Sequence, residues 1–112
     1  MSQITTHILD TSKGKPAWGV AVVLYERLAH EDIEIAKGTT NKEGRLINLL
    51  QEGETLVPGI YKMTFDIKHY FSSDDIHTFY PVIEITFEIK QREHYHIPLL
   101  VSPFGYSTYR GC

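Results

Sequence analysis

Apolar and polar side chains alternate along much of this chain, which is typical of β-strands that bury one face. The clearest case is residues 82–89, in which isoleucine and phenylalanine alternate with glutamate and threonine. Alternation or β-branched composition predicts further strands over residues 4–10, 33–39, 60–66 and 94–101. Residues 19–26 are almost continuously apolar, which indicates a strand that is covered on both faces or that lies at a subunit contact.

Turn-forming residues separate these runs. Residues 10–16 are rich in Asp, Ser, Gly and Pro, and the segment Asn41-Lys42-Glu43-Gly44 is typical of a hairpin turn in which Gly44 takes a positive φ. That turn puts Arg45 at the start of the next strand. Residues 67–73 break the alternation and predict about two helical turns. The pattern of about eight strands with short turns predicts an all-β fold, an antiparallel sandwich of two sheets.

Composition narrows the class of protein. The 112 residues predict one domain, residues 1–112, and the 42% hydrophobic and 22% charged shares are ordinary for a globular protein. A net charge of -3 gives no basic surface for nucleic acid or an anionic membrane. No apolar run reaches the length that spans a bilayer, the first residues lack the features of a signal peptide, and Cys112 has no partner for an internal disulfide. We expect a cytoplasmic protein.

Histidines occupy one face of the strand predicted over residues 94–101. His94, His96 and Pro98 share that face, and the opposite face carries the core residues Tyr95, Ile97, Leu99 and Val101. Imidazoles gain nothing from a core, so we interpret the histidine face as one that looks at a functional site. Pro98 lacks a backbone donor, so we expect its nitrogen to face outward or to lie at an irregularity of the ladder.

The remaining histidines divide into two groups. In residues 4–10, His7 shares a strand face with Thr5 and Leu9, and it therefore also lies on the surface of a sheet. Three histidines lie in polar or irregular segments and are assigned to the solvated surface: His30, His69 and His77.

Three kinds of chemistry are compatible with these residues. His7, His94 and His96 offer a three-histidine zinc site, although the His-x-His spacing is common by chance. Cys112 offers a nucleophile, but a terminal carboxylate disfavours its thiolate. The third reading needs neither: a neutral imidazole takes a proton from water, while Arg45 and Arg110 hold an anionic planar substrate and the oxyanion that develops.

One family resemblance covers essentially the whole chain. Residues 96–111, His-Ile-Pro-Leu-Leu-Val-Ser-Pro-Phe-Gly-Tyr-Ser-Thr-Tyr-Arg-Gly, resemble the C-terminal signature of 5-hydroxyisourate hydrolases, the transthyretin-related proteins of urate breakdown. Residues 6–10 resemble the family's first-strand histidine segment, and Glu43-Gly44-Arg45 resembles its arginine after a glycine turn. Residues 10–16 and 78–81 also resemble family segments. Several separated segments in the right order are far more specific than any one of them.

The resemblance implies a fold and an assembly. The expected fold is prealbumin-like, an antiparallel sandwich of two four-stranded sheets with one short helix. The expected assembly is a homotetramer, a dimer of dimers, with sites between the dimers. No cofactor and no metal ion is implied, and the expected partner is a small molecule.

The resemblance also implies a reaction and its residues. 5-Hydroxyisourate is hydrolysed to 2-oxo-4-hydroxy-4-carboxy-5-ureidoimidazoline, with His7 and His96 positioning and deprotonating water. Arg45 and Arg110 bind the substrate. The implied site comprises the catalytic residues His7, Arg45 and His96 and the terminal residues Tyr109, Arg110, Gly111 and Cys112. Cys112 stands where the family usually has serine, so we expect activity to be retained, at a level equal to or below that with serine.

Two other functions remain as alternatives. A small-ligand carrier of the transthyretin type has the same fold, and there the set of His7, Arg45, His96 and the terminal Tyr-Arg-Gly is expected to be idle. If the sandwich is an interaction module, the same residues are surface residues without a catalytic role. Which histidine is the general base depends on burial and partners, which the sequence does not display.

Overall fold

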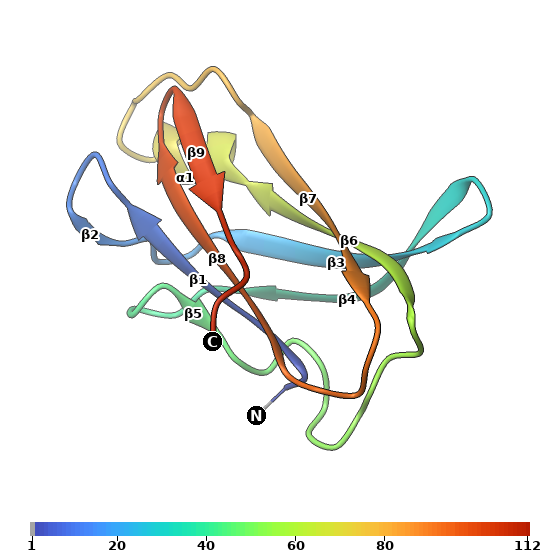
Figure 1. Ribbon diagram of the computed structural model, residues 1–112. Helices are drawn as coiled ribbons and strands as arrows, with labels where there is room; N and C mark the ends of the chain where they lie inside the picture. The colour runs from blue at the N-terminus through green and yellow to red at the C-terminus, as the bar shows by residue number, and fades with distance from the viewer. Residues whose placement is uncertain (1) are drawn as a thin grey trace.

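The computed structural model describes residues 2–112, which fold into nine strands and one short helix (Figure 1). In chain order these are β1 (Ile4–Asp10), β2 (Lys15–Pro16), β3 (Ala21–Leu28), β4 (Glu31–Thr39), β5 (Arg45–Leu46), β6 (Gly59–Asp66), α1 (Ile67–Ser72), β7 (Val82–Ile89), β8 (Tyr95–Ser102) and β9 (Gly105–Thr108). The bounds of β1 and β7 are those that alternation predicts. The all-β prediction is therefore confirmed.

The strands form two sheets that pack face to face. One sheet has the order β2-β1-β8-β9, with β5 paired to β1, and the other has the order β4-β3-β6-β7. Within residues 2–112 the first sheet thus has five strands where four were expected, because β2 and β5 are two-residue pairings on β1. The pairs are antiparallel except that β1 and β8 run parallel, from Ile4 opposite Tyr95 to Asp10 opposite Val101.

The core lies between the sheets and follows the alternation of the strands. Ile4, Ile8, Leu99 and Val101 from one sheet meet side chains of the other, and all are at most 1% exposed. The second sheet contributes the three residues that period two places inward on β6, namely Tyr61, Met63 and Phe65. Burial of a side chain of this size contributes roughly 1.5–3 kcal/mol, so this core fixes the face that each strand turns outward.

The bounds of the other strands follow from how the chain packs around them. β5 ends at Leu46, because the chain then turns so that Leu49 and Leu50 enter the core from a loop whose backbone bonds to Ser2. The strand expected over residues 19–26 begins and ends two residues later, as β3, and its outward residues Ala21, Val23 and Tyr25 are not fully covered in one chain. The predicted helix is present as α1, whose first turn is capped by the Asp66 carboxylate.

Candidate functional site

Three strands bring the predicted catalytic residues together. In the parallel pair of β1 and β8, Thr5 lies opposite His96 and His7 lies opposite Pro98. On the other side of β1, His7 lies opposite Arg45 of β5. His7, Arg45 and His96 therefore come from neighbouring positions on adjacent strands of one sheet, although 38 and 89 residues separate His7 from the other two.

A tight turn holds Arg45 against β1. The side-chain oxygen of Asn41 accepts hydrogen bonds from the backbone of Glu43 at 3.0 Å and of Arg45 at 2.9 Å. Gly44 has a φ of +72°, as the sequence predicts, and its carbonyl accepts a 2.8 Å bond from the Ile8 backbone. A Cβ at Gly44 would lie 2.4 Å from the Ile8 carbonyl oxygen, so only glycine permits this approach.

A small hollow, here called the histidine pocket, lies over this face of the sheet. Its volume is about 160 Å³, and it is lined by Thr5, Arg45, Ile47, His94, His96 and Cys112. The Thr5 hydroxyl lies 2.8 Å from Nε2 of His94 and 2.8 Å from Nδ1 of His96. Because Thr5 takes Nδ1, Nε2 is the nitrogen of His96 that remains for a substrate.

Burial and positive charge keep both candidate catalytic histidines neutral. Desolvation lowers the pKa of His96, and the nearby His94, Arg45 and His7 lower it further. Desolvation also lowers the pKa of His7, with Arg45 second, while a backbone hydrogen bond with Glu43 acts in the opposite direction. Neutral imidazoles next to a guanidinium can accept a proton beside a site that attracts an anion.

The end of the chain pairs with His96 in the register of the β8–β9 ladder, beyond a gap at Pro98. The Gly111 backbone donates a 2.8 Å bond to the His96 carbonyl, so the alternation of an antiparallel ladder requires Pro98 and Tyr109 to be the next bonded pair. Proline has no N–H, and β9 ends at Thr108. The ladder is therefore interrupted opposite Pro98, which is the irregularity that the sequence predicts, and resumes at Gly111.

Gly111 and Cys112 thereby join the histidine pocket. A Cβ on Gly111 would lie 2.5 Å from Cδ2 of His96, so the chain approaches the imidazole as closely as only glycine allows. Cys112 is exposed, carries a free thiol and lines the pocket. In Figure 1 the end of the chain lies beside β5, which agrees with the shared lining by Cys112 and Arg45.

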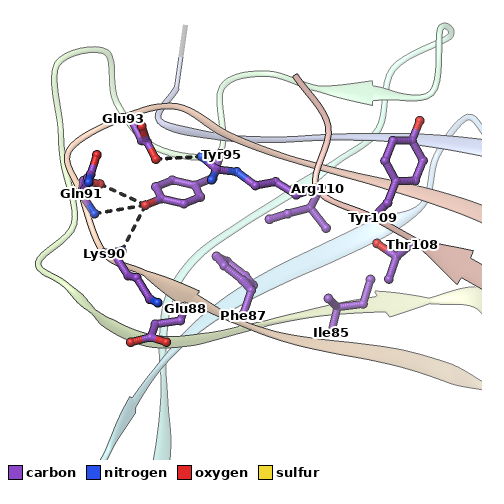
Figure 2. A pocket seen from close by; sticks show the side chains of 11 residues that line it. Ile85, Phe87, Glu88, Lys90, Gln91, Glu93, Tyr95, Thr108, Tyr109 and Arg110 are labelled. Atoms are coloured by element: carbon purple, nitrogen blue, oxygen red, sulfur yellow. Dashed lines mark hydrogen bonds and ion pairs between the residues drawn. The ribbon is translucent and has the colours of Figure 1, made fainter.

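The structure does not bring Tyr109 and Arg110 to the histidine pocket of their own chain. Both line a larger cavity of about 480 Å³ between β7 and β9 (Figure 2). The Arg110 guanidinium lies 4.5 Å from the centre of the Tyr95 ring, and its Nη2 is 2.9 Å from Oε1 of Glu93. Cation–π and ion-pair contacts thus direct Arg110 along the opposite face of β8 from His96.

Thr5 and His94 line the histidine pocket, but the sequence alone assigns them no role in a mechanism without metal. Alternation puts Thr5 on the face of His7 and His94 on the face of His96, but it does not show that Thr5 contacts His94. Their contact depends on the parallel pairing of β1 with β8, and a sequence pattern does not display which strands pair. The three histidines assigned to the surface, His30, His69 and His77, are exposed.

Within residues 2–112, no group of three or more His, Cys, Asp or Glu side chains is arranged to hold a metal ion. The same residues contain no helix that is long and apolar enough to cross a bilayer.

Comparison with known proteins identifies the family. Residues 4–111 match the model of the HIUase/Transthyretin family. The chain belongs to this family. A 5-hydroxyisourate hydrolase of Salmonella dublin is 44% identical over 109 residues, which cover 96% of this chain and 79% of the relative.

Solved structures of the family include both hydrolases and transthyretins. The 5-hydroxyisourate hydrolase of Klebsiella pneumoniae superposes with a TM-score of 0.86 at 35% identity, covering 97% of this chain and 98% of that one. Sea bream transthyretin in complex with thyroxine superposes with a TM-score of 0.91 at 33% identity, covering 98% and 95%. The transthyretin-like fold is confirmed. Since both kinds of protein share the fold, function must be argued from the site.

Proposed function

We propose that this protein is a hydrolase that opens the ring of 5-hydroxyisourate to 2-oxo-4-hydroxy-4-carboxy-5-ureidoimidazoline, in the breakdown of urate. The observation that carries the proposal is that β1, β5 and β8 bring His7, Arg45 and His96 to neighbouring positions of one sheet, where Arg45 and His96 line the histidine pocket. Relatives named 5-hydroxyisourate hydrolase, at 44% identity in Salmonella dublin and 40% in Mus musculus, support it.

The reaction needs a base for water and a partner for developing negative charge. A neutral imidazole, His96 at its free Nε2 or His7, takes a proton from water as the water oxygen attacks a ring amide carbon. The carbonyl oxygen becomes an oxyanion, which the Arg45 guanidinium stabilises. Collapse of this intermediate breaks the C–N bond, and the proton passes to the leaving nitrogen.

The lowered pKa values of both histidines suit this role. At neutral pH each ring keeps a lone pair, because burial and the Arg45 charge oppose protonation. Arg45 then has two functions: it binds an anionic substrate, and it keeps the base unprotonated before the substrate arrives.

A homotetramer of two dimers would complete the site. A volume of about 160 Å³ is below the range of roughly 300–1,000 Å³ that encloses small ligands, so one chain supplies one wall of the site. β7 and β9 are the last strands of their sheets and leave backbone groups that a second copy can pair with. In such an assembly the substrate-binding role expected of Tyr109 and Arg110 requires a contribution between chains or a movement of the terminal segment.

The test follows the near-ultraviolet absorbance of freshly prepared 5-hydroxyisourate. We expect the wild-type protein to accelerate its decay well beyond the spontaneous rate, and His96→Ala to lose about a hundredfold or more of that acceleration. His69→Ala is the matched control, because His69 is exposed on α1 and away from the histidine pocket. Decay at the spontaneous rate with wild-type protein, or normal activity of a correctly assembled His96→Ala variant, would overturn the proposal.

A further inference from the structure

The hydroxyl of Thr5 joins two imidazoles that cannot reach each other. The rings of His94 and His96 lie nearly parallel, 25° apart, with their centres separated by 6.2 Å. Thr5 Oγ1 lies 2.8 Å from Nε2 of one and 2.8 Å from Nδ1 of the other. Thr5 is 2% exposed, so bulk water does not replace either contact.

A hydroxyl has one proton, and this couples the two rings. If Nδ1 of His96 donates to Oγ1, the Thr5 hydroxyl donates to Nε2 of His94, and Nε2 of His96 is a free lone pair. If His94 donates from Nε2, the hydroxyl donates to Nδ1 of His96, and its Nε2 must carry a proton. The first arrangement makes His96 a base, and the second makes it a donor.

We propose that Thr5 and His94 form a proton relay that sets the base form of His96 and takes up the positive charge that His96 gains when it accepts a proton from water. This inference rests on the proposed function of the same site. Thr5 and His94 are positioning residues here, because they act on the reaction through His96.

The relay consists of three proton movements. Water gives its proton to Nε2 of His96 while its oxygen bonds to the substrate carbon. The Nδ1 proton of His96 moves to Thr5 Oγ1, and the Thr5 hydroxyl proton moves to Nε2 of His94. His96 is then neutral, with its proton on Nε2, and the positive charge resides on His94, which is exposed. When Nε2 gives its proton to the leaving nitrogen, the relay runs back, and His94 and Thr5 return the Nδ1 proton to His96.

The charges around the two rings favour this direction. His96 is partly buried and lines the histidine pocket with Arg45 and Cys112, and the charge of Arg45 lowers its pKa, so an imidazolium there lies near a guanidinium. His94 borders a second hollow that also holds Glu54, Arg92 and Glu93; Glu93 is paired with Arg110, so Glu54 and solvent are the groups that remain for a new positive charge. Moving the charge from His96 to His94 therefore lowers its electrostatic cost.

Substitutions at Thr5 separate the hydroxyl from the shape of the side chain. Thr5→Val keeps the branched side chain and removes the relay, and we expect kcat to fall about ten- to a hundredfold with little change in KM. Thr5→Ser restores the hydroxyl and is expected to recover most of kcat. Thr6→Val is the matched control, since Thr6 is the next residue of β1, is fully buried and donates only to the Ile97 carbonyl on the core side.

A substitution at His94 distinguishes its hydrogen bond to Thr5 from its ability to accept a proton. His94→Gln can still bond to Thr5 but cannot be protonated, so we expect kcat to fall and the solvent isotope effect to depend linearly on deuterium content. The wild-type protein is expected to show the curved dependence of several protons in motion. A linear dependence in the wild-type protein would contradict the relay.

Nitrogen NMR of the substrate-free protein provides a readout apart from activity. We expect the wild-type His96 ring to hold its proton on Nδ1, and the Thr5→Val ring to average between tautomers, with Thr6→Val like wild type. Two outcomes overturn the relay but leave the proposed function standing. One is an active wild-type enzyme whose Thr5→Val and Thr6→Val variants have equal kcat. The other is a His96 tautomer that does not change in Thr5→Val. A wild-type protein that does not hydrolyse 5-hydroxyisourate overturns the proposed function and the catalytic use of the relay with it.

Discussion

At the scale of single residues, the site depends on places where a side chain is absent. Gly111 touches the His96 ring so closely that any Cβ would overlap it, and this contact holds the end of the chain against the imidazole. Neither composition nor alternation predicts that contact, because it depends on the register in which the end of the chain pairs with β8. Alternation did predict the outward faces of His7 and His96, since period two is a local property.

Gly111→Ala tests this contact. The new Cβ would lie 2.5 Å from Cδ2 of His96, so the ring or the terminal segment must move, and we expect kcat to fall about ten- to a hundredfold. Gly105→Ala is the control, because a Cβ there meets nothing closer than 3.8 Å. Equal activity of the two variants in the absorbance assay would contradict the prediction.

Arg45 sets the titration of its neighbours. Its charge lowers the pKa of both His7 and His96. For His7 it is the largest cause after burial, and for His96 it follows burial and His94. Arg45→Gln is therefore expected to raise both pKa values. The rings then become charged at a higher pH, and the acid limb of the rate profile moves upward. Histidine titration by NMR measures this directly, with Lys42→Gln, an exposed change in the same turn, as control. Unmoved titrations in Arg45→Gln would show that the guanidinium does not act on the rings.

Replacing Cys112 by serine is expected to preserve activity, unlike the substitution of Gly111. A thiol is a poorer hydrogen-bond donor than a hydroxyl of similar shape, so Cys112→Ser is expected to keep or raise turnover by a few-fold at most. Steady-state hydrolysis measures it. Complete loss of activity would assign the sulfur a catalytic part.

At the scale of elements, β5 shows what sequence patterns capture and what they miss. The Asn41–Gly44 turn and the place of Arg45 after it were predicted, because turn chemistry is local. The length of β5 was not predicted, because Leu49 and Leu50 lie in a loop after Leu46 and still bury their side chains in the core. The contacts of Arg110 with Glu93 and Tyr95 were not predicted either, since they depend on the pairing of the chain end with β8.

Gly44→Ala tests how the turn fixes β5 on β1. An alanine at this positive φ costs about 1 to 3 kcal/mol of stability, and its Cβ would also meet the Ile8 carbonyl oxygen. Gly53→Ala has a similar φ of +84° with open space around it, so it isolates the backbone strain. We expect urea unfolding to show a larger loss for Gly44→Ala, with a loss of activity that Gly53→Ala does not share. Equal losses would mean that the close approach to Ile8 is unimportant.

At the scale of the whole molecule, the fold class was predictable and the completeness of the site was not. Alternation and short turns point to a sandwich in any order of strands, whereas no sequence pattern displays that Arg110 and His96 line different cavities of one chain. The histidine pocket of one chain has room for only part of an enclosed ligand. The proposed tetramer accounts for both observations.

Sedimentation over a range of concentrations tests the assembly. We expect a species of four 12.9 kDa chains, and specific activity that falls as dilution separates them. The absorbance assay on the same samples supplies the activity. A monomer with full specific activity would contradict the proposed tetramer and would require a complete site within one chain.

The parallel pairing of β1 with β8 also affects how the protein is made. Ile4 pairs with Tyr95 and Asp10 with Val101, so β1 leaves the ribosome well before the strand with which it pairs. Contacts of such long sequence separation form slowly, and the interim leaves one side of β1 open to wrong partners on the nascent polypeptide or on its neighbours. Since His7 and His96 lie on these two strands, a partly synthesised chain has no catalytic centre, and chaperones that shield β1 during translation are expected to raise the yield of active protein.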